Sequence, residues 1–266
     1  MKFIITGSEG FIGKALAAFI KNLSHEVIGV DRRIGIEAGE YFSTHSLEGI
    51  DAVFHLAAQT SVFNDNRGDI IRDNIDVFRI VSDACIKQNV PLVYASSSTA
   101  ERCNTTSLYG ISKRFDEEYA RCYNTKSVGV RFHNVYGPDP RNGTLLWHLL
   151  NNKSVRLFNE GRNKRHFTYI DDIVFGLWCI SRTMVECRIF PSAERNVVNI
   201  ANPEEMTTRE FAEIVRKYKS VELELVAEER GYDRREQRVN QGIYTLPLCY
   251  TSVAEGMKGV FGASRP

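Results

Sequence analysis

The chain has 266 residues, of which 43% are hydrophobic and 25% are charged, and its formal net charge is +1. This size and composition allow a substantial core and are ordinary for a globular protein. The small net charge gives no electrostatic reason to expect binding to nucleic acid or to an anionic membrane surface.

The sequence carries no evident targeting or metal-binding pattern. No stretch approaches 18 consecutive apolar residues, and the N-terminus lacks the long apolar segment and cleavage site of a secretory signal. The six cysteines form no C-x-x-C pair, and neither they nor the six histidines have the spacing of a zinc site. We therefore expect a cytoplasmic protein with free thiols and no metal.

Strand and helix signals alternate through the first half of the chain. Short apolar runs predict strands, and apolar residues at helical spacing predict helices. The expected strands cover residues 2–6, 26–30, 51–56, 91–96 and 127–132, and the expected helices cover residues 11–23, 70–88 and 109–124. This alternation predicts an α/β fold with a doubly wound parallel sheet, the Rossmann arrangement.

The pattern loosens after residue 137. Helices are expected at residues 145–151, 172–181 and 207–218, and a strand is expected at residues 197–200. The C-terminal end shows no closing-helix signature, and residues 242–247 have an irregular or strand pattern. We expect a dinucleotide-binding domain over residues 1–137, to which residues 160–201 partly return, and a small, trimmed substrate-binding lobe over residues 138–266.

Three glycines spaced three residues apart follow the first predicted strand and open the first predicted helix. Gly7 permits a tight turn, Gly10 lets the backbone approach a pyrophosphate, and Gly13 lets the helix pack on the strand. The helix N-terminus supplies free N–H groups for the same anion. The pattern therefore predicts a dinucleotide-binding turn.

A carboxylate stands where the second predicted strand ends. Asp31 follows Gly13 by eighteen residues, where an acid accepts the ribose hydroxyls of NAD and repels the 2′-phosphate of NADP. Arg32 and Arg33 come next and would tolerate a phosphate, so NAD is expected and NADP stays an open alternative. An acid for the adenine ring is not evident, and the candidates in its place are Ser43, Thr44 and His45.

A second constellation combines a phenol, an ammonium and a run of hydroxyls. Tyr109 and Lys113 are four residues apart, so they share one face of a helix. A neighbouring cation stabilises a phenolate, which lets a tyrosine act as acid or base near neutral pH. The serines at residues 96–98 follow an apolar strand, at the end where doubly wound sheets place their sites.

With these motifs the chain resembles the extended short-chain dehydrogenases/reductases, and within them the NAD-dependent epimerase/dehydratase family. The matching stretches, in the family's order, are TGSEGFIG (6–13), Asp31, DAVFHLAAQ (51–59), Asn74, YASSS (94–98), YGISK (109–113), RFHNVYGP (131–138) and GRNKRHFTYIDD (161–172). The resemblance implies that Tyr109 is the general acid/base and that Lys113 supports it. Ser98, or Ser97 if the register shifts by one residue, would orient the substrate.

The resemblance also implies ligand-binding residues and an assembly. The implied cofactor-binding residues are Gly7, Gly10, Phe11, Ile12, Gly13, Asp31, Arg32, Leu56, Ala57, Ala58, Tyr109 and Lys113. Asn134 would contact the diphosphate of a nucleotide sugar, and Arg165 would pair with the same anion. Because the helices at residues 70–88 and 109–124 form the dimer interface in many relatives, a homodimer is implied.

The residues after the strand-end serines narrow the reaction. Dehydratases of the family place an Asp-Glu pair there, whereas Thr99 and Ala100 follow Ser98 here, so a dehydratase is disfavoured. We expect an NAD-dependent nucleotide-sugar epimerase of the 4-epimerase type. The alternatives are a keto-sugar reductase or dehydrogenase with net redox change, and a non-catalytic NAD-binding sensor or scaffold. His55 and His133 are expected to pack in the core rather than to bind a ligand.

Overall fold

The computed structural model describes residues 1–60, 66–101, 107–190, 192, 196–228 and 239–262. Its centre is a parallel sheet with the strand order β10-β5-β4-β3-β1-β2. The strands are β1 (Lys2–Thr6), β2 (Glu26–Val30), β3 (Ala52–His55), β4 (Leu92–Ser97), β5 (Ser127–Phe132) and β10 (Val197–Ile200). Their carboxyl ends all point toward the same edge of the sheet.

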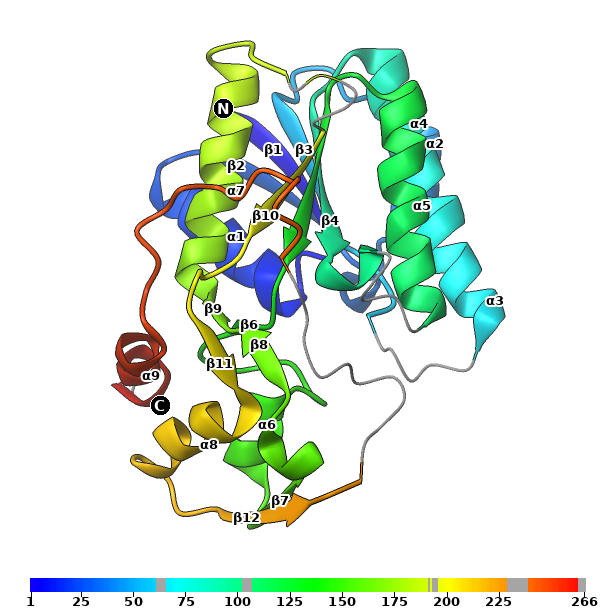
Figure 1. Cartoon of the computed structure of the whole chain (residues 1–266). Coiled ribbons are helices and arrows are strands. Elements are labelled where there is room, and N and C mark those ends of the chain that lie inside the picture. The colour runs from blue at the N-terminus through cyan, green and yellow to red at the C-terminus, as the bar shows by residue number, and fades with distance from the viewer. Residues whose placement is uncertain (61–65, 102–106, 191, 193–195, 229–238, 263–266) are drawn as a thin grey trace.

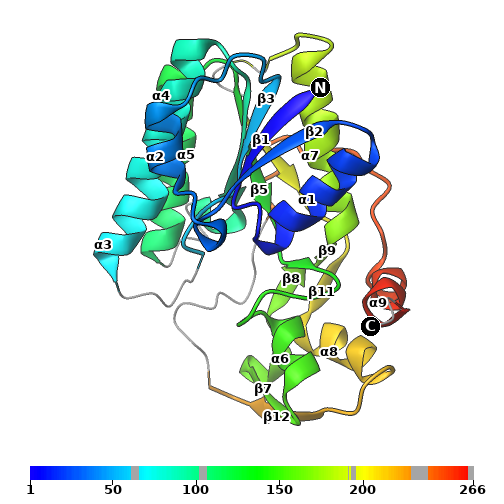
Figure 2. The ribbon, with the colours of Figure 1, turned by 180° about the vertical axis from the view of Figure 1, so that it is seen from behind.

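Helices cover both faces of the sheet (Figures 1 and 2). One face carries α1 (Phe11–Asn22) and α7 (Ile170–Val185), and the other carries α2 (Ala38–Thr44), α4 (Val77–Gln88) and α5 (Leu108–Tyr123). Side chains alternate across a strand, so Phe3 and Ile5 of β1 enter one buried cluster and Ile4 enters the other. The predicted doubly wound α/β fold is thus confirmed.

A smaller group of elements lies beyond the carboxyl edge of the sheet, at the bottom of Figure 1. We call this group the small lobe. It contains β6 (Val135–Tyr136), α6 (Leu145–Asn151), β7 (Ser154–Phe158), β8 (Lys164–His166), β9 (Thr168–Tyr169), β11 (Glu205–Thr207), α8 (Thr208–Arg216), β12 (Glu222–Val226) and α9 (Val253–Gly262). Three strand pairs brace it: β6 with β9, β7 with β12, and β8 with β11. The division of the chain into domains at residue 137 stays a prediction.

Two segments differ from the sequence expectation. The helix expected at residues 70–88 begins as α3 (Arg67–Ile70), passes through a π-helical turn, η2 (Ile71–Asp76), and only then becomes α4. Residues 31–51 contain the unpredicted α2 and no strand, so β2 forms an edge of the sheet. The π-turn matters because π-bulges commonly occur at functional sites, and this one buries Asp73 and Asn74.

The absence of a closing helix was wrongly predicted, because residues Val253–Gly262 form the helix α9, whereas residues 242–247 are irregular with a single bridge at Thr245, as expected. The start of α9 has a capping arrangement, in which the Ser252 hydroxyl accepts a hydrogen bond of 3.3 Å from the backbone N–H of Glu255. Val253 and Met257, four residues apart, are buried on its inner face. The serine followed three residues later by an acid was the signal that sequence reasoning missed.

The remaining sequence expectations concern what the chain lacks. Within the described ranges no helix is long and apolar enough to cross a membrane. The same residues contain no group of three or more histidine, cysteine or acidic side chains placed to hold a metal ion. The described cysteines form no disulfide, and Cys103 lies outside the described residues.

Candidate active site

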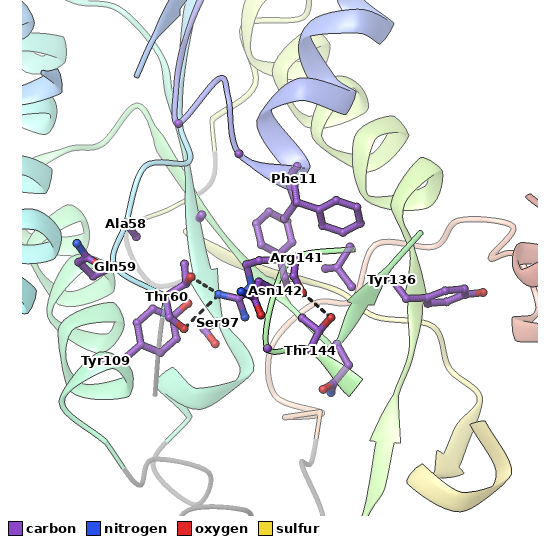
Figure 3. Close-up of a pocket in the computed structure, with 18 of the residues that line it drawn as sticks. Phe11, Ala58, Gln59, Thr60, Ser97, Tyr109, Tyr136, Arg141, Asn142 and Thr144 are labelled. Atoms are coloured by element: carbon purple, nitrogen blue, oxygen red, sulfur yellow. Dashed lines mark hydrogen bonds between the residues drawn. The ribbon is translucent and has the colours of Figure 1, made fainter. Parts of the chain in front are cut away.

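One large cavity of about 1080 Å³ lies between the carboxyl edge of the sheet and the small lobe. Figure 3 shows part of its wall, with Phe11, Tyr109, Ser97 and Arg141 around it. The cavity is not lined by the adenine candidates, but it is lined by the residues that the sequence predicted for catalysis, cofactor and diphosphate: Gly7, Gly10, Phe11, Ile12, Gly13, Asp31, Arg32, Leu56, Ala57, Ala58, Ser98, Tyr109, Lys113, Asn134 and Arg165. These residues come from separate parts of the chain, and only the fold brings them together.

The glycine turn between β1 and α1 is sterically fixed. Gly7 has a φ of +68°, and a Cβ there would lie 2.8 Å from the backbone nitrogen of Ala57. A Cβ on Gly13 would lie 2.1 Å from the carbonyl oxygen of Gly7, so only glycine fits. No side chain caps the start of α1 at Gly10, which leaves the first N–H groups of this 12-residue helix for a ligand.

Asp31 shapes the loop that follows β2. One carboxylate oxygen accepts a hydrogen bond of 3.0 Å from the backbone N–H of Glu9, and the other accepts one of 2.9 Å from the N–H of Arg33. The carboxylate therefore joins the glycine turn to the β2 loop while it still lines the cavity. Its spare lone pairs are available to ribose hydroxyls.

Asp73, on the π-turn, was not predicted. It accepts hydrogen bonds from Arg32 (3.1 Å), Arg72 (2.9 Å) and Gln59 (2.9 Å). Burial disfavours the ionised form of this carboxyl, but the hydrogen bonds from Arg32, Arg72 and Gln59 outweigh it and hold its pKa below the usual value. Arg32 is thus neutralised by a partner beside the cavity.

The adenine candidates proposed from the sequence are not in this region. Ser43 and Thr44 bond back to the carbonyls of their own helix, Gly39 and Glu40, and neither they nor His45 line the cavity. The short α2 occupies the stretch where an acid was sought, so its last turn points away from the site. The carboxylates that do line the cavity are Asp31, Glu37 and Asp73.

The catalytic candidates lie where β4 and α5 meet the cavity. β4 ends at Ser97, whose hydroxyl caps the 3₁₀ turn η3 (Ser98–Ala100) by accepting a hydrogen bond of 3.2 Å from the Thr99 N–H. Ser97 and Ser98 both line the cavity beside Tyr109 and Lys113. Two hydroxyls, a phenol and an ammonium therefore converge on one wall, as the sequence pattern suggested.

Lys113 has a buried partner on its own helix. Its Nζ lies 3.0 Å from Oδ2 of Asp116, and the two side chains are only 2% and 0% exposed. Burial raises the pKa of Asp116 to about 7, against the opposing attraction of the Lys113 ammonium. Sequence reasoning missed this pair, although its three-residue spacing on a helix was visible.

A second buried ion cluster stands behind the serines. Arg131 of β5 grips Glu117 of α5 with two hydrogen bonds of 2.7 Å, and it donates a further one of 2.6 Å to Glu101. Ser96 also donates to Glu117 at 2.5 Å. Glu101, the first carboxylate after the strand-end serines, is therefore committed to an arginine.

The small lobe supplies the other wall. Arg165 of β8 is buried and donates a hydrogen bond of 2.6 Å to the Lys164 carbonyl, and Asn134 follows β5 with a φ of +33°. Phe211 of α8 stacks on Phe167 with ring centroids 3.9 Å apart, and both rings line the cavity. Aromatic side chains combined with a few polar groups are the usual composition of a small-molecule site.

An arginine that the sequence reasoning did not single out bridges the two walls. Arg141, in the loop after β6, donates to the carbonyl of Thr60 at 3.3 Å and also to its hydroxyl (Figure 3). Thr60 belongs to the segment after β3, so this contact spans the cavity between the sheet and the small lobe. Arg141 thus joins Arg32, Arg33, Arg156 and Arg165 among the guanidinium groups that line the cavity.

The two histidines considered in the sequence lie outside the lining of the cavity. His55 is 1% exposed and shares a hydrogen bond of 2.8 Å with the Thr6 hydroxyl. Burial, with a smaller contribution from the Lys113 charge, lowers the pKa of His55 to about 3. Burial likewise lowers the pKa of His133 to about 3, beside the ring of His166.

Together, the glycine turn, the doubly wound sheet and the tyrosine–lysine helix define an enzyme of the short-chain dehydrogenase/reductase type. The chain belongs to the NAD dependent epimerase/dehydratase family, whose model matches residues 3–201. This match includes the glycine turn, the serines, Tyr109 and Arg165, and it ends before α8.

Known proteins agree with this placement. Protein CapI of Staphylococcus aureus is 32% identical over 225 residues, which cover 65% of this chain and 67% of that protein. UDP-glucuronate 4-epimerase 4 of Arabidopsis thaliana is 30% identical over 227 residues, which cover 65% of this chain and 52% of that protein. The solved structure of MoeE5 in complex with UDP-glucuronic acid and NAD superposes with a TM-score of 0.78 at 22% identity, over 98% of both chains. At that identity the likeness is one of fold.

Proposed function

We propose that this chain is an NAD-dependent nucleotide-sugar epimerase of the 4-epimerase type. The observation that carries the proposal is that Tyr109, Lys113 and the strand-end serines line the same cavity as the glycine turn. A site of this composition can move a proton on a sugar hydroxyl while a dinucleotide lies beside it. The similar structures of MoeE5 with UDP-sugars and NAD, and of UDP-glucuronic acid 4-epimerase from Bacillus cereus with UDP-glucuronic acid and NAD, support the same proposal.

The residues present fit a dinucleotide. The Gly7 and Gly13 positions have no room for a Cβ, and the uncapped N-terminus of α1 faces the cavity, as a pyrophosphate site requires. NAD is favoured over NADP because Asp31 lines the cavity and Arg32 is already paired with Asp73. A 2′-phosphate would meet the Asp31 carboxylate and an arginine whose charge is largely balanced.

The proton transfers are assigned to the chain's own side chains. Tyr109 as phenolate takes the proton of the sugar hydroxyl and later returns it, and Lys113 stabilises the phenolate. Ser98 or Ser97 holds the same substrate oxygen by a hydrogen bond. Bound NAD supplies the hydride chemistry, which the side chains cannot provide. Asn134 and Arg165 bind the diphosphate at the opposite wall.

The surroundings of Ser98 favour epimerisation over dehydration. Elimination needs a free acid and base beside the sugar, but Thr99 and Ala100 carry neither. The next residue, Glu101, is bound to Arg131 and also accepts a hydrogen bond of 2.7 Å from Asn240. A carboxylate held by two donors is poorly placed to abstract a substrate proton.

The direct test is a panel of UDP-, GDP-, dTDP- and CDP-sugars, including UDP-glucuronic acid, incubated with the protein and NAD. We expect an inverted sugar identified by NMR, with no mass change and with catalytic rather than stoichiometric NAD. Stoichiometric formation of NADH would favour net oxidation instead. Tight NAD binding with no turnover of any sugar would overturn the proposal and favour a sensor.

We also propose a homodimer through the outer face of α5. Ile111, Phe115 and Tyr123 are 52%, 37% and 64% exposed and recur at four- and eight-residue spacing along that helix. Ile111→Glu should convert the dimer to a monomer in sedimentation analysis. Phe175→Glu, at an exposed residue of α7 on the opposite face of the sheet, should not change the mass.

A further inference from the structure

Helix α5 carries two consecutive buried carboxylates with separate partners. Glu117 faces β4 and β5, where Ser96 and Arg131 bind it. Asp116 faces back along its own helix to Lys113. The residues at 109, 113 and 116 share one helix face, because they are spaced four and three apart. Asp116 is therefore the next group along the same face as the proposed acid/base.

The Lys113–Asp116 pair is costly as a structural element. Both groups have lost their hydration, and Oδ1 of Asp116 has no hydrogen-bond partner among the described residues. A buried ion pair with an unsatisfied oxygen contributes little to stability, and apolar residues of the same volume often do as well. The arrangement therefore calls for a functional reason.

We propose that Asp116 is a positioning residue that fixes the Lys113 ammonium at the cavity wall and balances its charge, so that the pair sets the acidity of Tyr109. This inference rests on the proposed role of Tyr109 as acid/base. An ammonium has three donors, and Asp116 occupies one, which leaves two for groups in the cavity that Lys113 lines. The carboxylate also reduces the field that the ammonium exerts on a phenolate.

Titratable groups on the same helix and on the sheet interact with this pair. Glu117 is its like-charged neighbour on α5, and Arg131 neutralises that charge. Tyr94 of β4 and His55 of β3 approach from the sheet, and both are uncharged because burial suppresses their ionised forms. Lys113 and its counter-ion Asp116 thus lie on the helix that carries Tyr109, and Lys113 lines the cavity together with Tyr109.

The test replaces the charge without changing the size of the side chain. Above about pH 7, where Asp116 is ionised despite its raised pKa, Asp116→Asn removes a negative charge beside the ammonium. The unbalanced ammonium should then stabilise the phenolate more strongly, so the acid limb of the pH–activity profile should move down by about one pH unit. Asp116→Glu, which keeps the charge, should leave the limb near its wild-type position. Glu118→Gln, an exposed carboxylate of the same helix paired with Arg121, is the matched control and should have no effect.

A second readout does not depend on knowing the substrate. The absorbance of the Tyr109 phenolate during a pH titration is obtained by subtracting the spectrum of the same protein with Tyr109→Phe. This difference is measured in the wild-type background and in the Asp116→Asn background, and the phenolate should appear at lower pH in the second. Asp116→Ser repeats the measurement with a smaller neutral residue if the asparagine variant does not fold. An unshifted limb together with an unshifted phenolate titration would overturn the inference. A shifted titration in a protein that turns over no sugar would refute only the proposed function.

Discussion

The two walls of the cavity are built in different ways. One wall, here called the cofactor wall, is formed by the glycine turn at residues 7–13 and the carboxyl edge of the sheet, and its shape is fixed by the backbone. A Cβ at Gly13 would lie 2.1 Å from the Gly7 carbonyl oxygen, and the turn follows a strand of a six-stranded sheet. The small-lobe wall is fixed by side chains on strands only two to five residues long. Positions that backbone sterics decide tolerate one residue type, whereas positions that side-chain packing decides tolerate many. A single substitution in the cofactor wall should therefore cause a large loss of stability and ligand affinity, whereas a single substitution in the small-lobe wall should cause a partial loss of ligand affinity.

The largest expected effect is on chemistry, and it should leave the cofactor wall intact. Tyr109→Phe removes the acid/base hydroxyl, so kcat should fall by about 10²- to 10⁴-fold. NAD affinity, measured by calorimetry, should change little because the glycine turn is untouched. Tyr123→Phe, at an exposed tyrosine of the same helix, is the control and should keep full activity. Undiminished turnover in Tyr109→Phe would end the proposed mechanism.

The next prediction tests whether a single substitution in the cofactor wall causes a large loss of stability and NAD affinity. In Gly13→Ala the new methyl group collides with the Gly7 carbonyl, so the protein should lose about 1–3 kcal/mol of stability and most of its NAD affinity. Gly39→Ala in α2 is the counterpart, since its Cβ would make ordinary contacts of 3.5 Å and longer. That variant should gain about 0.5–1 kcal/mol in thermal unfolding. Equal behaviour of the two would contradict the steric argument.

The prediction for the small-lobe wall, a partial loss of substrate affinity, is tested at Arg165. Arg165→Ala removes one cation from the proposed diphosphate site, so KM should rise by about 10- to 100-fold with NAD affinity unchanged. Arg162→Ala, in the same segment but with a side chain 69% exposed, should leave KM within twofold or so of wild type. Loss of NAD binding in Arg165→Ala would mean that the two walls are not independent.

The smallest expected effect is on the pH dependence of stability, and it involves two buried histidines, one at the end of β3 and one just after β5. His55 and His133 have pKa values lowered to about 3, so only the unfolded chain binds their protons near pH 6. Stability is therefore full above pH 6.5 and falls as the pH drops, by about 1.4 kcal/mol per histidine at pH 5.5. His133→Phe should remove one such contribution, which denaturant unfolding at pH 7.5 and 5.5 would detect. Asp116 has the opposite sign, because its raised pKa lets the folded state keep a proton, so only the difference between variants isolates the histidine.

The sequence predicted the cofactor wall better than the small-lobe wall for the same physical reason. The strands β1, β2 and β5 and the turn glycines were placed correctly because buried parallel strands and tight turns have restrictive residue patterns. The π-turn at η2 has no such pattern, since its residues read as ordinary helix. Strands β7 and β12 alternate weakly, and their pairing joins segments about seventy residues apart.

Side-chain partnerships were the least visible part of the site. The spacing of Lys113 and Asp116 predicts that they share one helix face, but an exposed pair at this spacing is common. Only the structure shows that both side chains are buried, which makes the pair unusual. The Arg141–Thr60 contact joins residues 81 apart, and only the folded chain brings them together. Fold class and cofactor turn follow from local rules, whereas partner choice follows from tertiary contact.

The lining of the cavity has a consequence for how such enzymes diversify. The family match stops at residue 201, yet Phe211 of α8 stacks on Phe167, and both rings line the cavity. The residues proposed for catalysis thus lie within the stretch matched by the family, whereas part of the cavity wall comes from the stretch that follows it. Exchange of the stretch after residue 201 can therefore change the shape of the cavity without changing Tyr109, Lys113 or the strand-end serines.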